Sequence, residues 1–500
     1  MTASNAHPAN TGPDVGQSPS LTPASERILS GRLGLEMARF GTPLAIGMGL
    51  QTAFNLVDAY LIGQLEPDVA SPALGAIGIC DQVTALGTIL SYGLTVAVGA
   101  LMSHFQGRRD PVAVRRVLYQ SLWLVLGLSA MFALVGLVGS RWLLSSAVGT
   151  KGEVLALGIP YLSVMMTTSS GIFLMLHFTS SLRAVGSSKT PVSLLVLANV
   201  VNLLLAIVLV YGPGPAPAIF SWGPPLARLL GLPRMGLMGA AWATAIARFA
   251  TLIPLVIILI RRFGLPESWS ELRPDRALLR RILTVGWPSS VQLVVRILAM
   301  LFTHALVARA FTSPGDQSAT TALGIVFRLE TMALFVGLGW GSAAQTFVGQ
   351  NLGADKLLRA KSSGWYAAAF NALMMAGLWL LYTRFGELII GMFDTNPSVV
   401  NVALDYLRWV SQSYIALGIG IVLGSAIQGA GATRKALWLD GSVVLLFQMP
   451  ISLLAVLAPG ASTVRLFQAV ALTYLAFALV HVASYWRGRF LHNSTLHVNA

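Results

Sequence analysis

Apolar runs of about 20 residues or more recur along almost the whole chain, separated by short polar segments. A helix of about 20 apolar residues crosses a hydrocarbon core of ~30 Å. The pattern contains no alternating barrel signature, and therefore predicts an all-α integral membrane protein. Its twelve predicted transmembrane helices cover residues 40–62, 74–104, 117–139, 155–180, 191–211, 236–260, 283–309, 320–348, 363–384, 402–428, 436–457 and 465–487.

The composition agrees with this prediction. Of the 500 residues, 55% are hydrophobic and 10% are charged, whereas about a quarter of a soluble domain is charged. Residues 1–38 are rich in Ser, Pro, Thr, Ala and Asn, so we expect a disordered cytoplasmic tail there. No apolar segment lies close to Met1, and the sequence therefore predicts no cleaved signal peptide.

The basic residues give the predicted orientation. With the N-terminus inside, 22 Lys and Arg residues fall on the inner side of the helices and 7 on the outer side. The positive-inside rule then places both termini in the cytoplasm of a multi-pass protein of the plasma (inner) membrane. The formal charge of +14 is explained by this topology. No basic segment contains the interleaved aromatic residues that stack on bases, so we expect no nucleic-acid partner.

The sequence also contains an internal repeat. Gly41–Pro43 recurs as Gly286–Pro288 at an offset of 245 residues, and each triplet opens a long apolar run. Gly107 returns as Gly353 at an offset of 246 residues. Landmarks that share nearly one offset indicate duplication.

The repeat divides the chain into two parallel six-helix bundles, related by a pseudo-two-fold axis along the membrane normal. We expect a first lobe over 39–262, a cytoplasmic linker over 263–282, a second lobe over 283–487 and a cytoplasmic tail over 488–500. Repeated lobes around a central cleft are typical of transport by alternating access.

Motif searches limit the energy source. The chain has no Gly-x-x-x-x-Gly-Lys-Ser/Thr loop for a nucleotide phosphate, and no His-Glu-x-x-His or Cys/His cluster for a metal. We therefore predict no cofactor, no metal site and no catalytic residue. Coupling to an ion gradient through an ionisable group inside the membrane remains.

Asp58 is the leading candidate for that group. Gln51, Asn55 and Asp58 have the spacing i, i+4, i+7, which places them on one face of the first helix. Asn199 and Asn202 share a face of the fifth helix. Together these side chains could form a wet polar nest in which a carboxylate carries a proton or helps to bind sodium. In the alternative interpretation, Asp58 only marks the helix end among the lipid headgroups.

The second repeat lacks these residues at equivalent positions. At the offset of 245, Gln51 and Asp58 become Arg296 and Thr303, and Asn202 becomes Phe447. Since the scaffold glycines recur and the polar residues do not, the sequence predicts a polar nest in the first lobe alone.

The chain resembles the multidrug and toxic compound extrusion (MATE) antiporters over about residues 34–487. The motifs that carry the resemblance are the paired Gly-x-Pro openings, Asn55-Leu-Val-Asp58, Asn199-x-x-Asn202, the segments HFQGRRD and VGQNLGADK, and the turns LRAVG and IQGAG. The resemblance implies a V-shaped pair of lobes that exports cationic or amphipathic compounds in exchange for protons or sodium.

Within that family the chain is more similar to the DinF-like branch than to NorM. Asp58 and Asn202 match the first-helix aspartate and fifth-helix asparagine of the DinF-like branch. That branch has a further acid where this chain has Ala206, which favours protons over sodium. The acids that the NorM branch carries in helices seven and ten are replaced here by Arg296 and Leu417.

Other polar residues are candidates for the cleft. Arg296 and Arg328 are expected either to pair with Glu330 or to face the cleft and favour anionic substrates. Gln51, Thr244 and Gln292 are the remaining candidate cavity residues.

We therefore predict a proton-coupled exporter of small amphipathic, mostly cationic compounds. Its expected partners are membrane lipid, a proton or sodium ion, and small-molecule drugs or metabolites, and we expect a monomer. A flippase for lipid-linked saccharides or lipids of the same superfamily is the alternative, and an intramembrane transferase is a third hypothesis.

Overall fold

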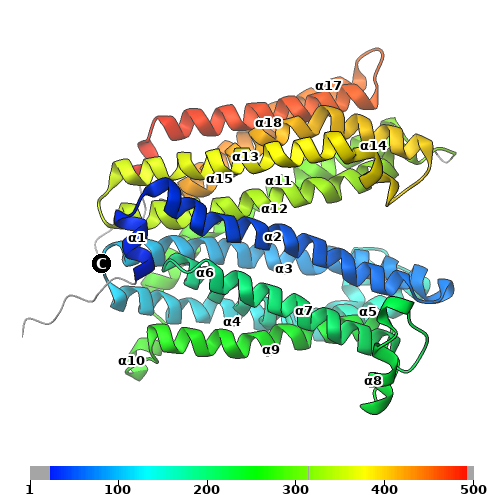
Figure 1. Cartoon of the computed structure of the whole chain (residues 1–500), viewed down its shortest axis with the longest axis horizontal. Helices are drawn as coiled ribbons and strands as arrows, with labels where there is room; N and C mark the ends of the chain where they lie inside the picture. The colour runs from blue at the N-terminus through cyan, green and yellow to red at the C-terminus, as the bar shows by residue number, and fades with distance from the viewer. Residues whose placement is uncertain (1–22, 314, 493–500) are drawn as a thin grey trace, which may run out of the picture.

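The computed structural model describes residues 23–313 and 315–492; within these ranges, the side chains at 52–59, 67 and 270 are outside the description. The chain folds into long, roughly parallel helices in two groups (Figure 1). Counted over the described residues, eleven continuous helical segments are long and apolar enough to cross a membrane. The 31-residue helix α2 is the twelfth long segment, so the architecture agrees with the twelve predicted spans.

The first lobe consists of six spans. They are α2 (Leu33–Gly63), α3 (Pro67–Gly107), α4 (Pro111–Trp142) with a π-helical turn at Leu143–Ala147, the pair α5 (Gly152–Thr167) and α6 (Ser169–Ala184), α7 (Lys189–Tyr211), and α9 (Leu237–Phe263). A connection with a short 3-10 turn at Ala218–Phe220 and the short helix α8 (Gly223–Leu229) precedes α9.

The second lobe repeats this order after the short helix α10 (Trp269–Leu272). Its spans are α11 (Arg276–Ala310), α12 (Ser318–Gly353), α13 (Leu357–Gly391), α14 (Pro397–Val410) with α15 (Tyr414–Gly429) joined by the 3-10 turn Ser411–Ser413, α16 (Thr433–Val443) with α17 (Met449–Leu457) joined by the π-helical turn Val444–Gln448, and α18 (Thr463–Trp486). The tenth span is thus interrupted at the same place as the fourth, as expected for a duplicated fold.

Three of the expected domain boundaries need correction. Residues 23–30 form helix α1 (Pro23–Ser30) and α2 begins at Leu33, so the end of the segment expected to be a disordered tail is helical. The expected linker holds α10 and the first turns of α11. In the expected C-terminal tail, Arg489–Leu491 form a 3-10 turn whose Phe490 is buried against Tyr485. Short amphipathic and charged helices at a membrane face escape a hydropathy pattern because they are not apolar throughout.

Helix α1 lies at one end of the bundle, which we call the α1 face. The end of α18 lies at the same face. Lys356, just before α13, donates to the carbonyl of Leu29 in α1 over 2.9 Å. Lys361, at the start of α13, donates to the carbonyl of Trp486 at the end of α18 over 2.8 Å.

The two lobes touch through paired glycines near the α1 face. A Cβ atom at Gly107 would lie 2.0 Å from the carbonyl oxygen of Gln350, and a Cβ atom at Gly353 would lie 2.0 Å from the carbonyl oxygen of His104. The ends of α3 and α12 therefore cross backbone to backbone, as small residues allow in membranes. The repeated glycines that first indicated a duplication thus form a nearly symmetric contact between the lobes.

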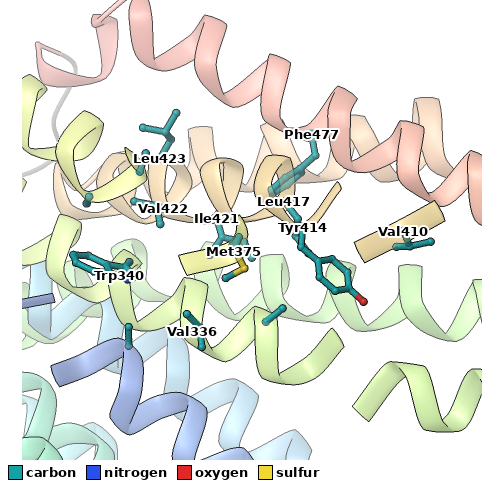
Figure 2. Close-up of a cluster of buried hydrophobic side chains, with 14 of the residues drawn as sticks. Val336, Trp340, Met375, Val410, Tyr414, Leu417, Ile421, Val422, Leu423 and Phe477 are labelled. Carbon is teal, nitrogen blue, oxygen red and sulfur yellow. The ribbon is translucent and has the colours of Figure 1, made fainter. Parts of the chain in front are cut away.

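The second-lobe core lies where α12, α13, α15 and α18 converge (Figure 2). Trp340 is 2% exposed, and it also reaches across to the first lobe. The Cβ atom that Gly41 lacks would lie 2.2 Å from the Trp340 ring. The glycine of the first Gly-x-Pro triplet therefore makes room for a side chain of the other lobe.

Candidate functional site

The first-lobe candidates lie where α2, α7 and α9 pack together. The hydroxyl of Thr244 on α9 donates to Oδ1 of Asn202 on α7 over 3.1 Å. Asn199, one turn earlier on α7, is half-buried, as is Gln51 on α2. The structure therefore brings Thr244 and Asn202 together, and it places Asn199 and Gln51 on the helices of the same group.

The side chains of Asn55 and Asp58 lie outside the described residues, although their backbone belongs to α2. A hydrogen bond of 3.0 Å from the Tyr211 hydroxyl to the Leu61 carbonyl joins the C-terminal ends of α7 and α2. We take these two ends to lie at about the same distance from the α1 face. At ~1.5 Å per residue, Asp58 lies roughly 4.5 Å, Asn202 roughly 13.5 Å and Gln51 roughly 15 Å from those ends, in the direction of the α1 face. The backbone of Asp58 is thus about 9 Å farther from the α1 face than Asn202.

The second lobe contains a charged network that the sequence analysis did not predict. Nε of Arg296 on α11 lies 2.6 Å from Oδ2 of Asp440 on α16. Nε2 of His481 on α18 lies 3.1 Å from the other carboxylate oxygen. The Asp440 and His481 side chains are completely buried. The expected pairing of Arg296 with Glu330 is therefore wrong, because a carboxylate on the adjacent α16 is in direct contact with the guanidinium.

These three helices correspond to the three first-lobe helices described above. α11, α16 and α18 contribute to the first, fifth and sixth spans of their lobe, as α2, α7 and α9 do in theirs. The second lobe thus has a charged nest of its own on the equivalent helices. Arg296 is the equivalent of Gln51 at the offset of 245, but Asp440 and His481 fall opposite Leu195 and Gly236, so a comparison that started from the polar first-lobe residues did not reveal them.

Gln292 extends the second-lobe network toward the α1 face. It lies one turn before Arg296 on α11, is 2% exposed, and accepts a hydrogen bond of 2.6 Å from Nε2 of Gln428 on α15. On the other side, the guanidinium carbon of Arg296 lies 5.6 Å from the centre of the Phe477 ring, in cation–π geometry. Arg296 is thus held by an acid and an aromatic ring at once.

Glu330 forms a separate site in the second lobe. The hydroxyls of Tyr406 on α14 and Tyr474 on α18 each donate to one of its carboxylate oxygens. Across the parts of the chain that the structure describes, no cationic side chain forms an ion pair with Glu330. Arg328 is exposed and takes no part in this site. The expected Arg328–Glu330 pair is therefore not formed, and the carboxyl group is held by phenols instead.

One sequence signal could have led to the second-lobe nest. Asp440 lies inside the predicted span 436–457, where an acid is costly and usually functional. The basic pair Arg434 and Lys435 lies just before it and is typical of a helix entrance, which makes this signal weak. In the described residues, no group of three or more His, Cys, Asp and Glu side chains could hold a metal ion.

Comparison with known proteins identifies the class. The solved structure of a MOP superfamily transporter from Pyrococcus furiosus superimposes with a TM-score of 0.82 at 21% identity, covering 95% of this chain and all of that one. A structure of a multidrug resistance MATE family transporter in an outward-facing conformation gives 0.81 at 21% identity, over 96% of this chain and all of the other. The fold is therefore that of a two-lobed membrane transporter.

The family follows from the sequence comparison. A model of the MatE family matches twice, over residues 43–208 and 289–454, so the second match begins 246 residues after the first. The chain belongs to the MatE family of membrane transporters and is not an enzyme, and the two matches confirm the predicted repeat.

Two curated relatives cover most of the chain. It is 25% identical to the "Probable multidrug resistance protein YpnP" of Bacillus subtilis over 407 residues, which are 81% of this chain and 84% of the relative. It is 24% identical to an "FAD transporter" of Shewanella oneidensis over 431 residues, which are 85% and 89% of the two chains.

Proposed function

We propose that this protein is a secondary active exporter of small amphipathic, mostly cationic compounds, and that it exchanges them for protons. The observation that carries the proposal is the convergence of α2, α7 and α9, where the Thr244–Asn202 hydrogen bond lies near the helix that bears Asp58. The names of relatives such as the "Multidrug export protein MepA" of Staphylococcus aureus support multidrug export as the general activity.

Asp58 is proposed as the proton carrier. Desolvation in a closed nest favours the neutral acid, and opening to water favours release of the proton. Ala206, the position where the DinF-like branch has a further acid, is completely buried and offers no ligand. Sodium prefers several oxygen ligands, so the lack of one here favours protons. The same residues support placing the chain with the DinF-like branch.

The lobe contacts support alternating access. With both termini proposed to be cytoplasmic, the α1 face is the cytoplasmic face. The backbone contacts at Gly107 and Gly353 then hold the two lobes together on that side. Inward opening must separate these glycines, whereas an outward-facing state keeps them in contact.

The second-lobe network bears on the charge of the substrate. Arginines near the cleft were the reason to consider a flippase for lipid-linked saccharides, but the charge of Arg296 is balanced by Asp440. That alternative therefore loses the support of Arg296. The relative named for FAD transport makes an anionic dinucleotide a useful member of a substrate panel.

The test is transport by the purified protein in proteoliposomes under imposed gradients. We expect a proton gradient to drive accumulation of a lipophilic cation at least tenfold faster than a sodium gradient of equal size. FAD and a neutral amphipath serve as comparison substrates. Transport that follows the sodium gradient, or that is confined to FAD, would contradict the proposal.

A further inference from the structure

A cavity of about 470 Å³ opens at the α1 face of the first lobe. It lies between α1, α2, the turn that joins α6 to α7, and the end of α9. Four cationic side chains line it, each from a different one of these elements: Arg27, Arg39, Lys189 and Arg262. Glu36 is the one carboxylate in its lining.

The positive charge of this cavity is only partly balanced. Glu36 lies 3.0 Å from Nη1 of Arg39 and 3.6 Å from Nε of Arg27, so one carboxylate serves two guanidinium groups. In the described part of the chain, neither Lys189 nor Arg262 has a carboxylate within ion-pair distance. The fold thus holds four cations around one acid, an arrangement that an anion would stabilise.

Two further features suit an anion. Arg262 is fixed in the wall of the cavity, because its Nη2 donates to the carbonyl of Val185 over 3.1 Å. Ser188, just before α7, and Lys189, its first residue, also line the cavity, and the Ser188 side chain does not cap the helix. The partial positive charge of this 23-residue helix therefore adds to that of the side chains.

The position of the cavity points to a lipid. Arg39 lies near the start of α2, Lys189 opens α7, and Arg262 precedes the last residue of α9, so the cations lie at the ends of membrane-spanning helices. Basic pockets between helices at a membrane face bind anionic headgroups. Free phosphate would satisfy the same cations without needing this location.

An exposed apolar stripe continues from the cavity along α2. Leu35, Arg39, Ile46 and Leu50 have the spacing i, i+4, i+11 and i+15, which places them on one helix face. The three apolar side chains are 48%, 56% and 41% exposed. An acyl chain could follow Ile46 and Leu50 away from a phosphate held at Arg39.

We propose that this cavity binds the phosphate headgroup of an anionic phospholipid, with its acyl chains along the exposed stripe of α2. The cavity volume is within the usual range for small-ligand sites of about 300–1,000 Å³. The phosphate is held by cations from α1, α2, α7 and α9, so it connects α1 to the body of the first lobe.

A lipid bound in this cavity would also strengthen the contact between the two lobes. Helix α1 already bridges them, since the Ser25 hydroxyl donates to Val185 in the first lobe over 3.2 Å and Arg359 in the second lobe donates to Ile28 over 3.1 Å. A lipid that fixes Arg27 stabilises this bridge and thereby the joined α1 face. This consequence rests on the proposed alternating access, whereas the binding site itself does not.

The experiment measures lipid binding by the purified full-length protein, using native mass spectrometry and thermal unfolding. The probes are phosphatidylglycerol, phosphatidylcholine and inorganic phosphate. We expect phosphatidylglycerol to remain bound and to raise the Tm more than the other two. The double variant Arg39→Gln/Lys189→Gln should bind it roughly 30-fold more weakly, since each basic residue near a membrane surface contributes about 1 kcal/mol.

Arg141→Gln serves as the matched control, because Arg141 is exposed at the end of α4 and outside the cavity. It should bind phosphatidylglycerol as the wild type does. If the double variant does not fold, Lys189→Gln alone is used, with an expected loss of roughly fivefold. Equal binding of the two lipids, full binding by the variants, or stabilisation by inorganic phosphate alone would overturn the proposal. These readouts involve no transport, so they are independent of the proposed function.

Discussion

Arg296 and Asp440 form an ion pair inside the second lobe, with Nε and Oδ2 separated by 2.6 Å between α11 and α16. The Asp440 side chain is completely buried, whereas that of Arg296 is 17% exposed. Removal of one partner from a buried pair leaves an uncompensated charge, which costs about 3–5 kcal/mol, whereas replacement of both by apolar residues is often neutral.

We therefore expect Asp440→Leu to lower the unfolding temperature strongly, and the double variant Arg296→Leu/Asp440→Leu to recover most of the loss. Thermal unfolding of the purified variants checks this. Glu387→Leu is the control, since Glu387 is an exposed acid on α13. If the double variant is as unstable as Asp440→Leu, the instability does not come from the unpaired arginine.

The stability of the protein should depend on the two phenols that donate hydrogen bonds to Glu330. Tyr406→Phe removes one hydrogen bond to the buried carboxyl, and Tyr474→Phe removes the other. Each change should cost about 1–3 kcal/mol, because a buried polar group loses a partner. Chemical denaturation of the purified proteins would measure this loss.

Tyr366→Phe is the matched control for these variants, because Tyr366 is 46% exposed on α13. It should leave the stability unchanged. A loss in the control as large as that in Tyr406→Phe would show that the carboxyl contact is not the cause.

The glycine contact at the α1 face should set the balance between conformations. Gly353→Ala places a methyl group 2.0 Å from the carbonyl oxygen of His104, so α3 and α12 must move apart. Spin labels at the exposed Val112 and Leu358, on the two lobes, report the separation. We expect the distance distribution to shift to longer values.

Gly377→Ala is the control for this shift, because a Cβ atom at Gly377 meets nothing within 4 Å. It should leave the distance distribution as in the wild type. An unchanged distribution in Gly353→Ala would mean that the contact at the α1 face does not limit lobe separation.

The opposite face carries a pair with a predictable pH dependence. Nη1 of Arg234, in the connection before α9, donates to Glu66 at the start of α3 over 2.9 Å. This hydrogen bond lowers the pKa of Glu66 below its ordinary value of 4.5. The stabilisation is therefore present above that value and is lost as the pH falls through the lowered pKa.

Limited proteolysis of the connection 212–236 between pH 3 and pH 7 tests this pair. In the wild type, cleavage by an acid-tolerant protease should increase only below the ordinary pKa of Glu66. Glu66→Gln should show the increased cleavage at every pH, whereas Asp316→Asn, in another loop, should follow the wild type. A wild type and a Glu66→Gln variant with the same pH profile would contradict the assignment.

The sequence predicted the fold well because two simple signals determine it. Apolar length located the spans, and the glycines of the repeat, such as Gly107 and Gly353, are required wherever the lobes approach each other. The site was predicted only in part. Thr244 and Asn202 do meet, but Arg296 pairs with an acid 144 residues away. Such pairing depends on helix packing, which a single sequence does not encode locally.

Helix α1 was missed for a different reason. Its sequence PASERILS is short and polar on average, so it is similar to the preceding residues in composition. Its position is determined by tertiary contacts, chiefly hydrogen bonds from Arg359 and Lys356 to its backbone carbonyls. No periodicity in the chain anticipates these contacts.

Proton release coupled to transport tests the role of Asp58 most directly. In proteoliposomes with an imposed proton gradient, Asp58→Asn should reduce export of a lipophilic cation by at least 100-fold and abolish the accompanying proton flux, with an unchanged unfolding temperature. Asp68→Asn, at an exposed acid at the start of α3, should retain both. Proton-driven export by Asp58→Asn at the wild-type rate would contradict the proposed coupling through this residue.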